Sequence, residues 1–360
     1  MSINTVSGVE SKSDNSVDVS FLEPKMGTLI IGKAGIGKST YLLENYSGDD
    51  CLITAFTGIA SARLESRTLS SLFCLGYESS NSLKLALSII YRTKKHIEIR
   101  EKTKLVIDEY YTLPRESMEK VDKILQEINQ CQEPFGGMEL VLIGDDRQTA
   151  AVGDPFVESE LYKRLEFRKI TLPDHPKMRL APRYMKFCNE FRNPKLNTKK
   201  IIQLLEDPRF AKTEVPGYVV YHENKNVDAR NKEEMDKFDG DVIGTVRGVE
   251  YKKGCPICIT NNGPDVFNGM LGKILSIDKK TKTVEIEFDE YILETDLKSV
   301  KFVPAFAMTI HKAQCSTFNG INIYLDSSKI KMDKDDFLRL IYTALTRVRT
   351  FKKCHIGWLN

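Results

Sequence analysis

The sequence predicts an α/β protein built on a parallel sheet. Short apolar runs alternate with helical patterns through the first half of the chain, and five of them look like buried strands: 28–32, 51–56, 104–109, 140–145 and 168–172. Over residues 117–128, apolar side chains recur at helical spacing on one face: Met118, Val121, Ile124, Leu125 and Ile128. Strands that are buried on both faces and separated by helices are typical of a parallel sheet.

The second half of the chain has a different pattern. Apolar runs at 217–222 and 322–326 are consistent with strands of a second α/β sheet. Between them, Val284, Ile286 and Phe288 alternate with polar residues, which is typical of a half-buried strand. We therefore expect a small β-barrel over residues 263 to about 302, inserted into the second α/β domain.

The composition limits the class of protein. The chain has 360 residues, 41% of them apolar, and a net charge of +3. This length suffices for two or three packed units, and the near-balanced charge is not that of a strongly basic DNA-coating protein. No apolar run approaches the ~18 residues that would span a bilayer. The eight scattered cysteines and a polar N-terminus without an apolar segment predict a soluble, intracellular protein whose first residues are disordered.

A phosphate-binding loop follows the first predicted strand. Residues 32–40, GKAGIGKST, match G-x-x-x-x-G-K-[ST] and lead into a helical pattern. Glycines let backbone N–H groups wrap around phosphates, and the helix N-terminus adds a favourable dipole. The expected nucleotide contacts are Gly32, Gly35, Ile36, Gly37, Lys38, Ser39 and Thr40. Within this set, Lys38 should reach the β- and γ-phosphates, and Ser39 the Mg²⁺ ion of ATP.

Two later strands end in residues suited to ATP hydrolysis. Residues 105–109, LVIDE, deliver Asp108 to a position where it can hold Mg²⁺ with Ser39. The neighbouring Glu109 can polarise the attacking water. Another buried strand ends at Asp145, and the neutral amide of Gln148 can contact the γ-phosphate. Two carboxylates beside a phosphate-binding loop indicate hydrolysis and not only nucleotide binding.

Nine motifs occur in order between about residues 28 and 350: GKAGIGKST, TAFTGIAS, TLSSLF, VIDEY, GDDRQ, MRLAPRYMKFCNEFRN, FNGMLG, AMTIHKAQCSTF and YTALTRVR. This order resembles a superfamily 1 helicase of the Pif/RecD/Dda type. The resemblance implies two RecA-like domains that grip ATP between them, with an SH3-like barrel inserted in the second. The domains expected from it are a disordered tail at 1–20, RecA-like domain one at 21–173 with a short insertion near 74–103, RecA-like domain two at 174–262 and 303–360, and the barrel at 263–302.

The resemblance also implies roles for individual residues. Arg179 and Arg347 match two arginine fingers, with Arg183 as the alternative to Arg179, and Thr317 lies toward the nucleotide. The positions that match contacts to the backbone of a single strand are Thr57, Gly58, Thr68, Ser71, Asn268, His311 and Lys312. Cys315 replaces the glycine that the family usually has, so we expect a backbone there without a positive φ.

The implied function is an ATP-dependent helicase that moves 5′→3′ on single-stranded DNA. A monomer without membrane contact is expected, with replication or recombination proteins as candidate partners. The compact length suggests a viral or phage version, which would act in the host nucleus or cytoplasm. Two alternatives stay open: a viral-type RNA helicase, and an ATP-driven nucleic-acid-binding switch without unwinding, which the short 74–103 interval favours.

Three other patterns suggest different chemistry. Cys255, Cys258, His311 and Cys315 are a candidate zinc set, although residues three apart on a strand face opposite sides. A Cys/His pair is also a candidate nucleophile, but no other feature suggests acyl transfer. Residues 224–228, NKNVD, approach the guanine-specifying pattern N-K-x-D, and we interpret them as a loop.

Overall fold

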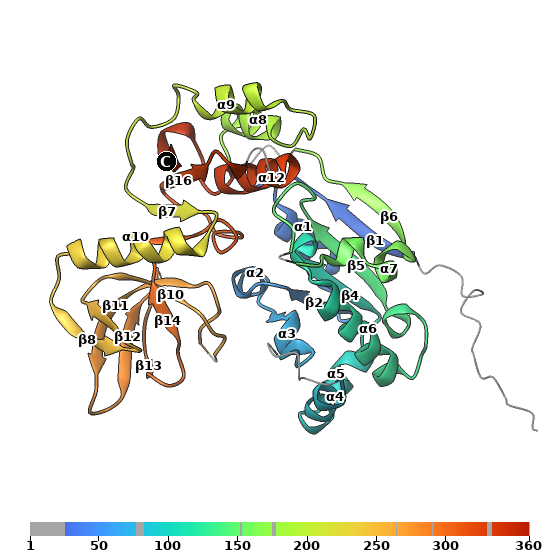
Figure 1. Cartoon of the computed structure of the whole chain (residues 1–360). Helices are drawn as coiled ribbons and strands as arrows, with labels where there is room; N and C mark the ends of the chain where they lie inside the picture. The colour runs from blue at the N-terminus through green and yellow to red at the C-terminus, as the bar shows by residue number, and fades with distance from the viewer. Residues whose placement is uncertain are drawn as a thin grey trace, which may run out of the picture.

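The computed structural model describes residues 26–76, 83–151, 153–174, 178–263, 265–289, 291–329 and 333–359. The expected disordered tail at 1–20 lies outside these ranges. Within them the chain forms two α/β units and a smaller antiparallel sheet, which are well separated in Figure 1. None of the helices in these ranges is long and apolar enough to cross a membrane.

A six-stranded parallel sheet forms the core of the first α/β unit. Its strands lie in the order β3-β2-β4-β5-β1-β6. They are β1 (Met26–Ile31), β2 (Cys51–Ala55), β3 (Arg67–Thr68), β4 (Lys104–Asp108), β5 (Glu139–Gly144) and β6 (Glu166–Thr171). All five strands predicted from apolar runs are present, and neighbouring strands pair in parallel as expected.

Strand β6 departs from the prediction. Its residues are exposed or only half-buried, whereas β4 and β5 are almost entirely buried. In the described sheet β6 pairs with β1 alone, at the edge. A strand at an edge has protein on one side only, so fewer side chains cover it. The apolar run at 168–172 is therefore an edge strand, and its prediction as a buried strand was wrong.

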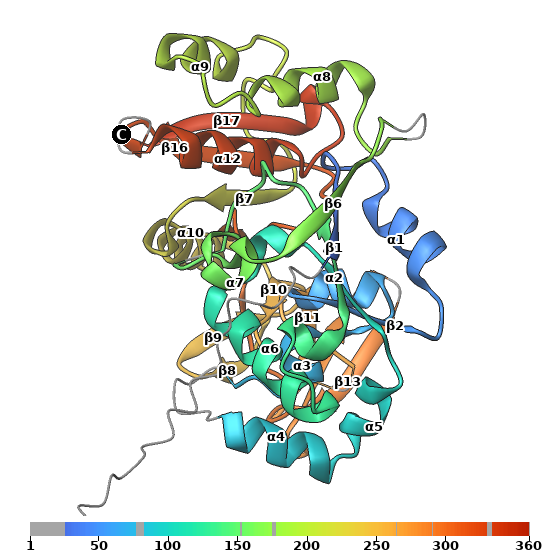
Figure 2. The same cartoon turned by 90° about the vertical axis from the view of Figure 1, so that its right-hand side faces the viewer.

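Short helices and 3₁₀ turns connect these strands. The helices are α1 (Lys38–Tyr46), α2 (Gly58–Arg63), α3 (Leu69–Leu72), α4 (Leu83–Arg92), α5 (Lys95–Arg100), α6 (Arg115–Asn129) and α7 (Glu160–Lys163). The 3₁₀ turns are η2 (Tyr110–Thr112), η3 (Pro134–Gly137) and η4 (Phe156–Glu158). The helix predicted over 117–128 lies within α6, and all five of its apolar residues are buried. Helices α4 and α5 lie within the interval 74–103, at the end of this unit far from α12 (Figures 1 and 2).

The second α/β unit contains a four-stranded parallel sheet in the order β15-β7-β16-β17. The strands are β7 (Tyr218–Tyr221), β15 (Ala307–Thr309), β16 (Ile321–Asp326) and β17 (Cys354–Leu359), so both predicted strands are confirmed. Its helices are α8 (Pro182–Glu190), α9 (Thr198–Leu205), α10 (Asn224–Lys237) and α12 (Lys334–Leu345), with a 3₁₀ turn η5 (Phe351–Lys353). Helix α12 is the most deeply buried of these and packs in one core with strands β16 and β7.

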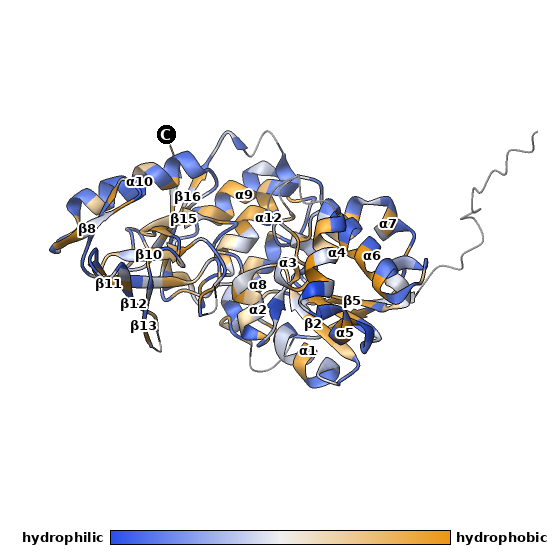
Figure 3. Cartoon of the chain, turned by 90° about the horizontal axis from the view of Figure 1, so that it is seen from below, coloured by the Kyte–Doolittle hydropathy of each residue, from blue (hydrophilic) through white to orange (hydrophobic). Residues whose placement is uncertain are grey.

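The expected loop at 224–228 is instead the first part of helix α10. Val227, Asn231 and Met235 recur every four residues and form the buried side of this helix. The rest of α10 is largely hydrophilic, as Figure 3 shows. The resemblance to a guanine-specifying loop therefore has no structural basis here, because helical geometry and not a loop places these side chains.

A five-stranded antiparallel sheet lies between β7 and β15 in the chain. Its order is β13-β12-β11-β10-β14, and a hairpin of β8 (Val242–Val246) and β9 (Val249–Lys252) precedes it. The strands are β10 (Pro256–Ile259), β11 (Leu271–Asp278), β12 (Thr283–Glu287), β13 (Ile292–Asp296) and β14 (Phe302–Pro304). The alternation in β12 is confirmed, with Val284 and Ile286 inside.

This antiparallel sheet and the hairpin before it, which together we call the insert, share a core that includes Tyr251, Ile257, Ile286 and Phe302, with Met235 of α10 packed into it. The insert is wider than the expected 263–302, because β10 and β14, the first and last strands of its sheet in the chain, pair with each other. An SH3-like barrel form for the insert, and the domain boundaries given above, stay predictions.

Candidate functional site

The loop between β1 and α1 has the backbone that a phosphate-binding loop needs. Gly35 and Gly37 have φ of 77° and 95°, in the left-handed region that glycine adopts at little cost. Gly37 caps the N-terminus of α1, and Lys38 is the first residue of that helix. The Lys38 ammonium donates a hydrogen bond to the carbonyl of Lys33 at 3.2 Å. The loop therefore presents a helix N-terminus and a cation at the same place.

A cleft of about 550 Å³ lies over this loop and is lined by both α/β units. We call it the central cleft. The residues expected at the nucleotide or in catalysis that line it are Gly35, Gly37, Lys38, Ser39, Thr40, Glu109, Gln148, Arg179, Thr317 and Arg347. The lining also includes Ala34, Arg63, Met178, Cys315 and Arg349, for which the sequence predicted no nucleotide contact.

Gly32 and Ile36 do not line the central cleft. The Ile36 side chain is 5% exposed and packs in the same core as Leu180 of the second unit. A Cβ on Gly32 would lie 2.7 Å from Ile36 Cδ1, so the absent side chain makes room for isoleucine. These two residues can therefore contact phosphate only through their backbone groups.

Asp108 lies directly behind Ser39. The Ser39 hydroxyl donates to Asp108 Oδ2 at 3.0 Å, and the Glu109 N–H donates to Oδ1 at 2.8 Å. Burial, and then the neighbouring Glu109 carboxylate, raise the pKa of Asp108 to about 6. A buried carboxylate held against a serine hydroxyl is suited to a hard cation such as Mg²⁺, which would favour its charged form.

Glu109 has an unusual backbone. Its φ is 59°, in the left-handed region that few residues other than glycine adopt, and it precedes the 3₁₀ turn η2. Such strained positions cluster at functional sites. The turn follows the end of β4 directly, and Glu109 lines the central cleft while Asp108 stays buried beneath it. Two adjacent carboxylates thus occupy different layers of the site.

The second unit contributes two arginines to the central cleft, of which Arg347 is buried and Arg179 half-buried. Arg179 Nη1 donates to Thr317 Oγ1 at 2.7 Å and Nη2 to the Thr346 carbonyl at 2.9 Å. Its Nε is buried and has no hydrogen-bond partner within the described part of the chain. Arg347 is 2% exposed and donates to the carbonyl of Thr343 at 2.8 Å. Neither guanidinium has a hydrogen bond to a carboxylate in the described ranges.

The arginines repel one another. Burial, and then the charges of Arg347 and Arg63, lower the pKa of Arg179 to about 9, and burial also lowers the pKa of Arg347. Uncompensated guanidinium groups beside a phosphate-binding loop make this cleft attractive to a multiply charged anion. Arg183 is exposed on α8 and does not line the cleft, so the geometry favours Arg179 over its alternative.

The stretch 307–320 reaches the cleft from the second unit. The Gln314 side-chain amide donates to Gln148 Oε1 at 3.4 Å, and the Thr149 hydroxyl donates to Gln314 Oε1 at 2.8 Å. Thr317 lines the cleft beside Arg179. Thr317 thus lies at the cleft, whereas Gln314 lies behind it, against Gln148.

The expectation for Cys315 was wrong. Its φ is 67°, so the backbone keeps the positive φ that a glycine would adopt freely. Two contacts hold it there: the Thr57 hydroxyl donates to Cys315 Sγ at 3.4 Å, and the Arg63 guanidinium donates to the Cys315 carbonyl. The left-handed conformation costs roughly 1–2 kcal/mol for such a residue, and these contacts with α2 offset it.

The four residues of the candidate zinc set lie in different surroundings. Cys255 is in the core of the insert, and Cys315 is buried against Thr57. His311 lies with its ring 6.2 Å from that of His222. Among the described residues, no group of three or more histidine, cysteine or acidic side chains is arranged to hold a metal ion. The zinc alternative has no geometric support.

Strand-binding positions in the first unit lie at the starts of short helices. Thr57 caps α2 and Thr68 caps α3, where its hydroxyl accepts from Ser71 N–H at 3.2 Å. Thr68 and Ser71 line a cavity of about 700 Å³ together with residues of the insert, among them Phe267. A Cβ on Gly58 would lie 2.9 Å from the Asn268 carbonyl, so α2 touches the insert. The first unit and the insert thus share one cavity and touch beside it.

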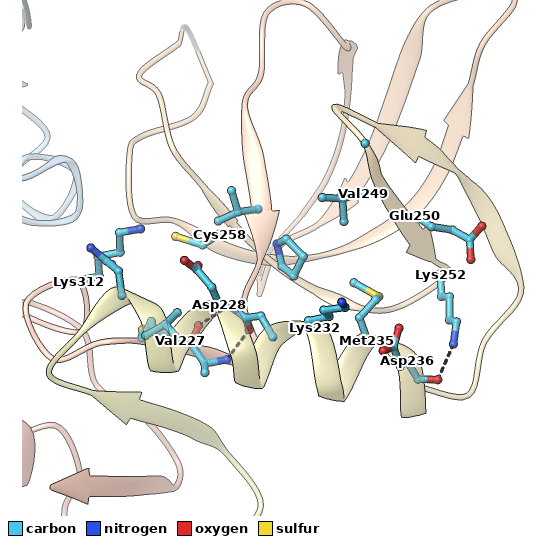
Figure 4. A pocket seen from close by; sticks show the side chains of 17 residues that line it. Val227, Asp228, Lys232, Met235, Asp236, Val249, Glu250, Lys252, Cys258 and Lys312 are labelled. Atoms are coloured by element: carbon cyan, nitrogen blue, oxygen red, sulfur yellow. Dashed lines mark hydrogen bonds between the residues drawn. The ribbon is translucent and has the colours of Figure 1, made fainter. Parts of the chain in front are cut away.

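His311 and Lys312 lie elsewhere. Lys312 is at one end of a cavity of about 740 Å³ between α10 and the insert, near Asp228 and Cys258 (Figure 4). Burial, and then the neighbouring His222, lower the pKa of His311, which favours the neutral ring. Of the expected strand contacts, Thr68 and Ser71 thus line one cavity and Lys312 lines another, while the remaining four line neither. His222 was not singled out from the sequence, because a lone histidine after a strand carries no local signal.

Comparison with known proteins gives a consistent result. A PIF1-like helicase family model matches residues 13–162. A protein of Bdellovibrio bacteriovorus named ATP-dependent DNA helicase Pif1 is 22% identical over 97% of this chain and 88% of its own length. The PIF1 helicases of Saccharomyces cerevisiae and Emericella nidulans are 26% and 24% identical, and the chain spans only 29% and 43% of their lengths. These relatives come from cellular organisms, so they do not support a viral or phage origin, which stays a prediction.

Solved structures agree with the fold. The Pif1 helicase of Candida albicans has a TM-score of 0.68 at 21% identity, covering 93% of this chain and 92% of that one. A Bacteroides Pif1 in complex with ADP-AlF₃ and single-stranded DNA has a TM-score of 0.67 at 20% identity, covering 93% and 88%. The two α/β units have the RecA-like architecture of these proteins. In motif order, in the matched part of its sequence and in fold, the chain is similar to superfamily 1 helicases of the Pif1/RecD type.

Proposed function

We propose that the chain is an ATP-dependent helicase that moves 5′→3′ on single-stranded DNA. One observation carries the proposal: the phosphate-binding loop and Glu109 of one RecA-like domain line the same cleft as Arg179 and Arg347 of the other. An ATPase whose site is divided between two domains can convert hydrolysis into relative movement of those domains.

The cleft fits a magnesium–nucleotide complex. Gly35 and Gly37 leave the loop backbone open to phosphates, and the unpartnered Nε of Arg179 is available to an anion. Ser39 and Asp108 would hold Mg²⁺, which would neutralise charge on the phosphates. Lys38 would contribute a point charge from the first helical residue.

Hydrolysis would then use residues that the cleft brings together. Glu109 orients a water and accepts its proton. Arg179 and Arg347 stabilise the charge that develops on the γ-phosphate. Gln148 lines the cleft and accepts a hydrogen bond from Gln314 of the second domain. Loss of the γ-phosphate could therefore change the position of Gln314.

Two segments would connect the nucleotide with the strand. In the stretch 307–320, Thr317 faces the cleft, while His311 and Lys312 lie beyond it. Helix α2 carries Thr57 at its start and Arg63, which lines the cleft, at its end. Each segment has one end near the nucleotide and the other near the strand. Binding of ATP and binding of the strand would therefore favour the same relative position of the two domains.

The relatives support this assignment. The curated relatives carry the name ATP-dependent DNA helicase, and Bacteroides Pif1 has been solved with single-stranded DNA. DNA replication and repair are the processes that fit such an activity. Contacts with replication or recombination proteins and a monomeric state are part of the same proposal.

A strand-displacement assay tests the function. Duplexes with a 5′ tail, a 3′ tail or an RNA strand are incubated with ATP and Mg²⁺, with Lys38→Ala as the inactive control. Unwinding of the 5′-tailed DNA alone is the expected result. Preference for the RNA strand would indicate the RNA helicase alternative. Strand-stimulated ATP hydrolysis without unwinding of any duplex would indicate the switch.

A further inference from the structure

One tyrosine of the second RecA-like domain reaches the phosphate-binding loop of the first. Tyr342 lies on α12 and has no exposed surface. Its hydroxyl accepts from the Ala34 N–H at 3.1 Å and donates to Asp145 Oδ2 at 2.8 Å. Arg192 Nη1 also donates to it at 3.0 Å. The hydroxyl is thus fully used, and two of its three partners belong to the other domain.

Asp145 is the centre of this contact. It is 1% exposed and forms an ion pair with Arg192, which also binds Asp146 at 2.9 Å. Burial alone would raise the pKa of Asp145, yet Lys38, Arg192 and the Tyr342 hydroxyl bring it below its usual value. The carboxylate is therefore charged, and it attracts the same lysine that the proposed function assigns to the phosphates.

The phenol ring and the hydroxyl of Tyr342 have different roles. The ring packs in the core with Tyr184 and Ile341, where a phenylalanine would fit equally well. Only the hydroxyl connects the loop amide, the buried carboxylate and the arginine. Its removal would leave Ala34 N–H and one oxygen of Asp145 without this partner, at a net cost of about one hydrogen bond each.

We infer that Tyr342 is a positioning residue for the phosphate-binding loop. Its hydroxyl fixes the amide of Ala34 in the loop and shares the charge of Asp145 with Arg192, which leaves Lys38 free for the phosphates. Because Tyr342 and Arg192 belong to the second domain, the loop is ordered for nucleotide only while the two domains are in contact. The inference rests on the proposed function of the central cleft.

The test is Tyr342→Phe, with Tyr184→Phe as its matched control. Tyr184 is 1% exposed, and its hydroxyl donates to the Leu345 carbonyl at 2.8 Å within its own domain. For Tyr342→Phe we expect the KM for ATP to rise roughly 3- to 10-fold, with kcat changed less than about twofold. Hydrogen exchange of loop amides 32–40 should be faster without nucleotide. Tyr184→Phe should leave the KM and the loop exchange as in the wild type.

Either of two results would overturn the inference: loop exchange and KM equal to those of the wild type, or a fall in kcat at unchanged KM. Hydrogen exchange is measured without ATP, so it tests the inference independently of ATP binding. If the wild type neither binds nor hydrolyses ATP, that finding refutes the proposed function and not the inference. Should Tyr342→Phe fail to fold, Arg192→Lys takes its place. It keeps the charge but cannot serve both carboxylates and the hydroxyl, and it should shift KM in the same direction.

Discussion

The central cleft and the strand-binding positions are built in different ways. Most residues expected at the nucleotide line one cavity, where buried charges from two domains converge. Of the residues expected at the strand, Thr68 and Ser71 line one cavity, Lys312 lines another, and the rest line neither. A nucleotide is held once per cycle in one geometry, whereas a strand must slide, so its contacts are numerous and individually weak. Convergence on one cavity therefore marks the first site and not the second.

The largest effect should come from the arginines of the second domain. Arg179→Ala and Arg347→Ala are each expected to slow ATP hydrolysis roughly 10³- to 10⁵-fold, with a far smaller loss of nucleotide affinity. Single-turnover hydrolysis and nucleotide titration measure the two quantities. Arg183→Ala, exposed on the same segment, is the matched control. If Arg183→Ala slowed hydrolysis and Arg179→Ala did not, Arg183 on α8 would be the first arginine finger. The assignment of Arg179 to the cleft chemistry would then be wrong.

Glu109→Gln should have the next largest effect. The amide keeps the size of the side chain but cannot accept a proton, so hydrolysis should fall roughly 10²- to 10⁴-fold while ATP stays bound. A bound-nucleotide assay after rapid filtration, followed over time, measures both. Glu127→Gln, on the exposed side of α6, is a control for the same change away from the cleft. Normal single-turnover hydrolysis by Glu109→Gln would assign the base elsewhere.

The strand side should respond more gently. His311→Ala is expected to leave the ATPase rate without DNA unchanged and to reduce its stimulation by single strands. Lys312→Ala should lower the slope of log affinity against log salt by about 0.7, as expected for one phosphate contact. Lys279→Ala, in an exposed turn of the insert, is the control for charge alone. Equal loss of basal and stimulated rates in His311→Ala would place this residue with the cleft instead.

The smallest effect is expected at Cys315. Cys315→Gly relieves the left-handed strain but loses the buried thiol and its contact with Thr57, so the free energy of unfolding should change by less than about 1 kcal/mol. Cys315→Val, whose branched side chain tolerates a positive φ poorly, should be destabilising by about 2 kcal/mol or more. Denaturant unfolding of both variants measures the difference. Equal stability of the two would show that the backbone relaxes at this position.

The same contrast explains what the sequence could predict. Apolar runs identified most strands of the two parallel sheets but not β3, β15 or β17. The loop motif identified Lys38 and Ser39. Both kinds of signal are local in the chain. The contacts of Tyr342, Arg192 and Arg63 with the cleft were not predicted. They join segments more than a hundred residues apart, and nothing in their local sequence indicates a partner. The positive φ of Cys315 was missed because tertiary contacts, and not residue type, impose it.

The way in which the insert joins the chain has a consequence for the order of folding. Strands β7 and β15 are neighbours in the second parallel sheet, but the whole insert separates them in sequence. The insert has one core, into which Met235 of α10 also packs, and β10 and β14, the first and last strands of its sheet in the chain, pair directly. If the insert forms first, it shortens the loop that the β7–β15 pairing must close by roughly half, which saves about 0.6 kcal/mol of chain entropy. We expect the insert to fold first and to bring the chain ends at β7 and β15 close together. The second RecA-like domain would then complete its parallel sheet.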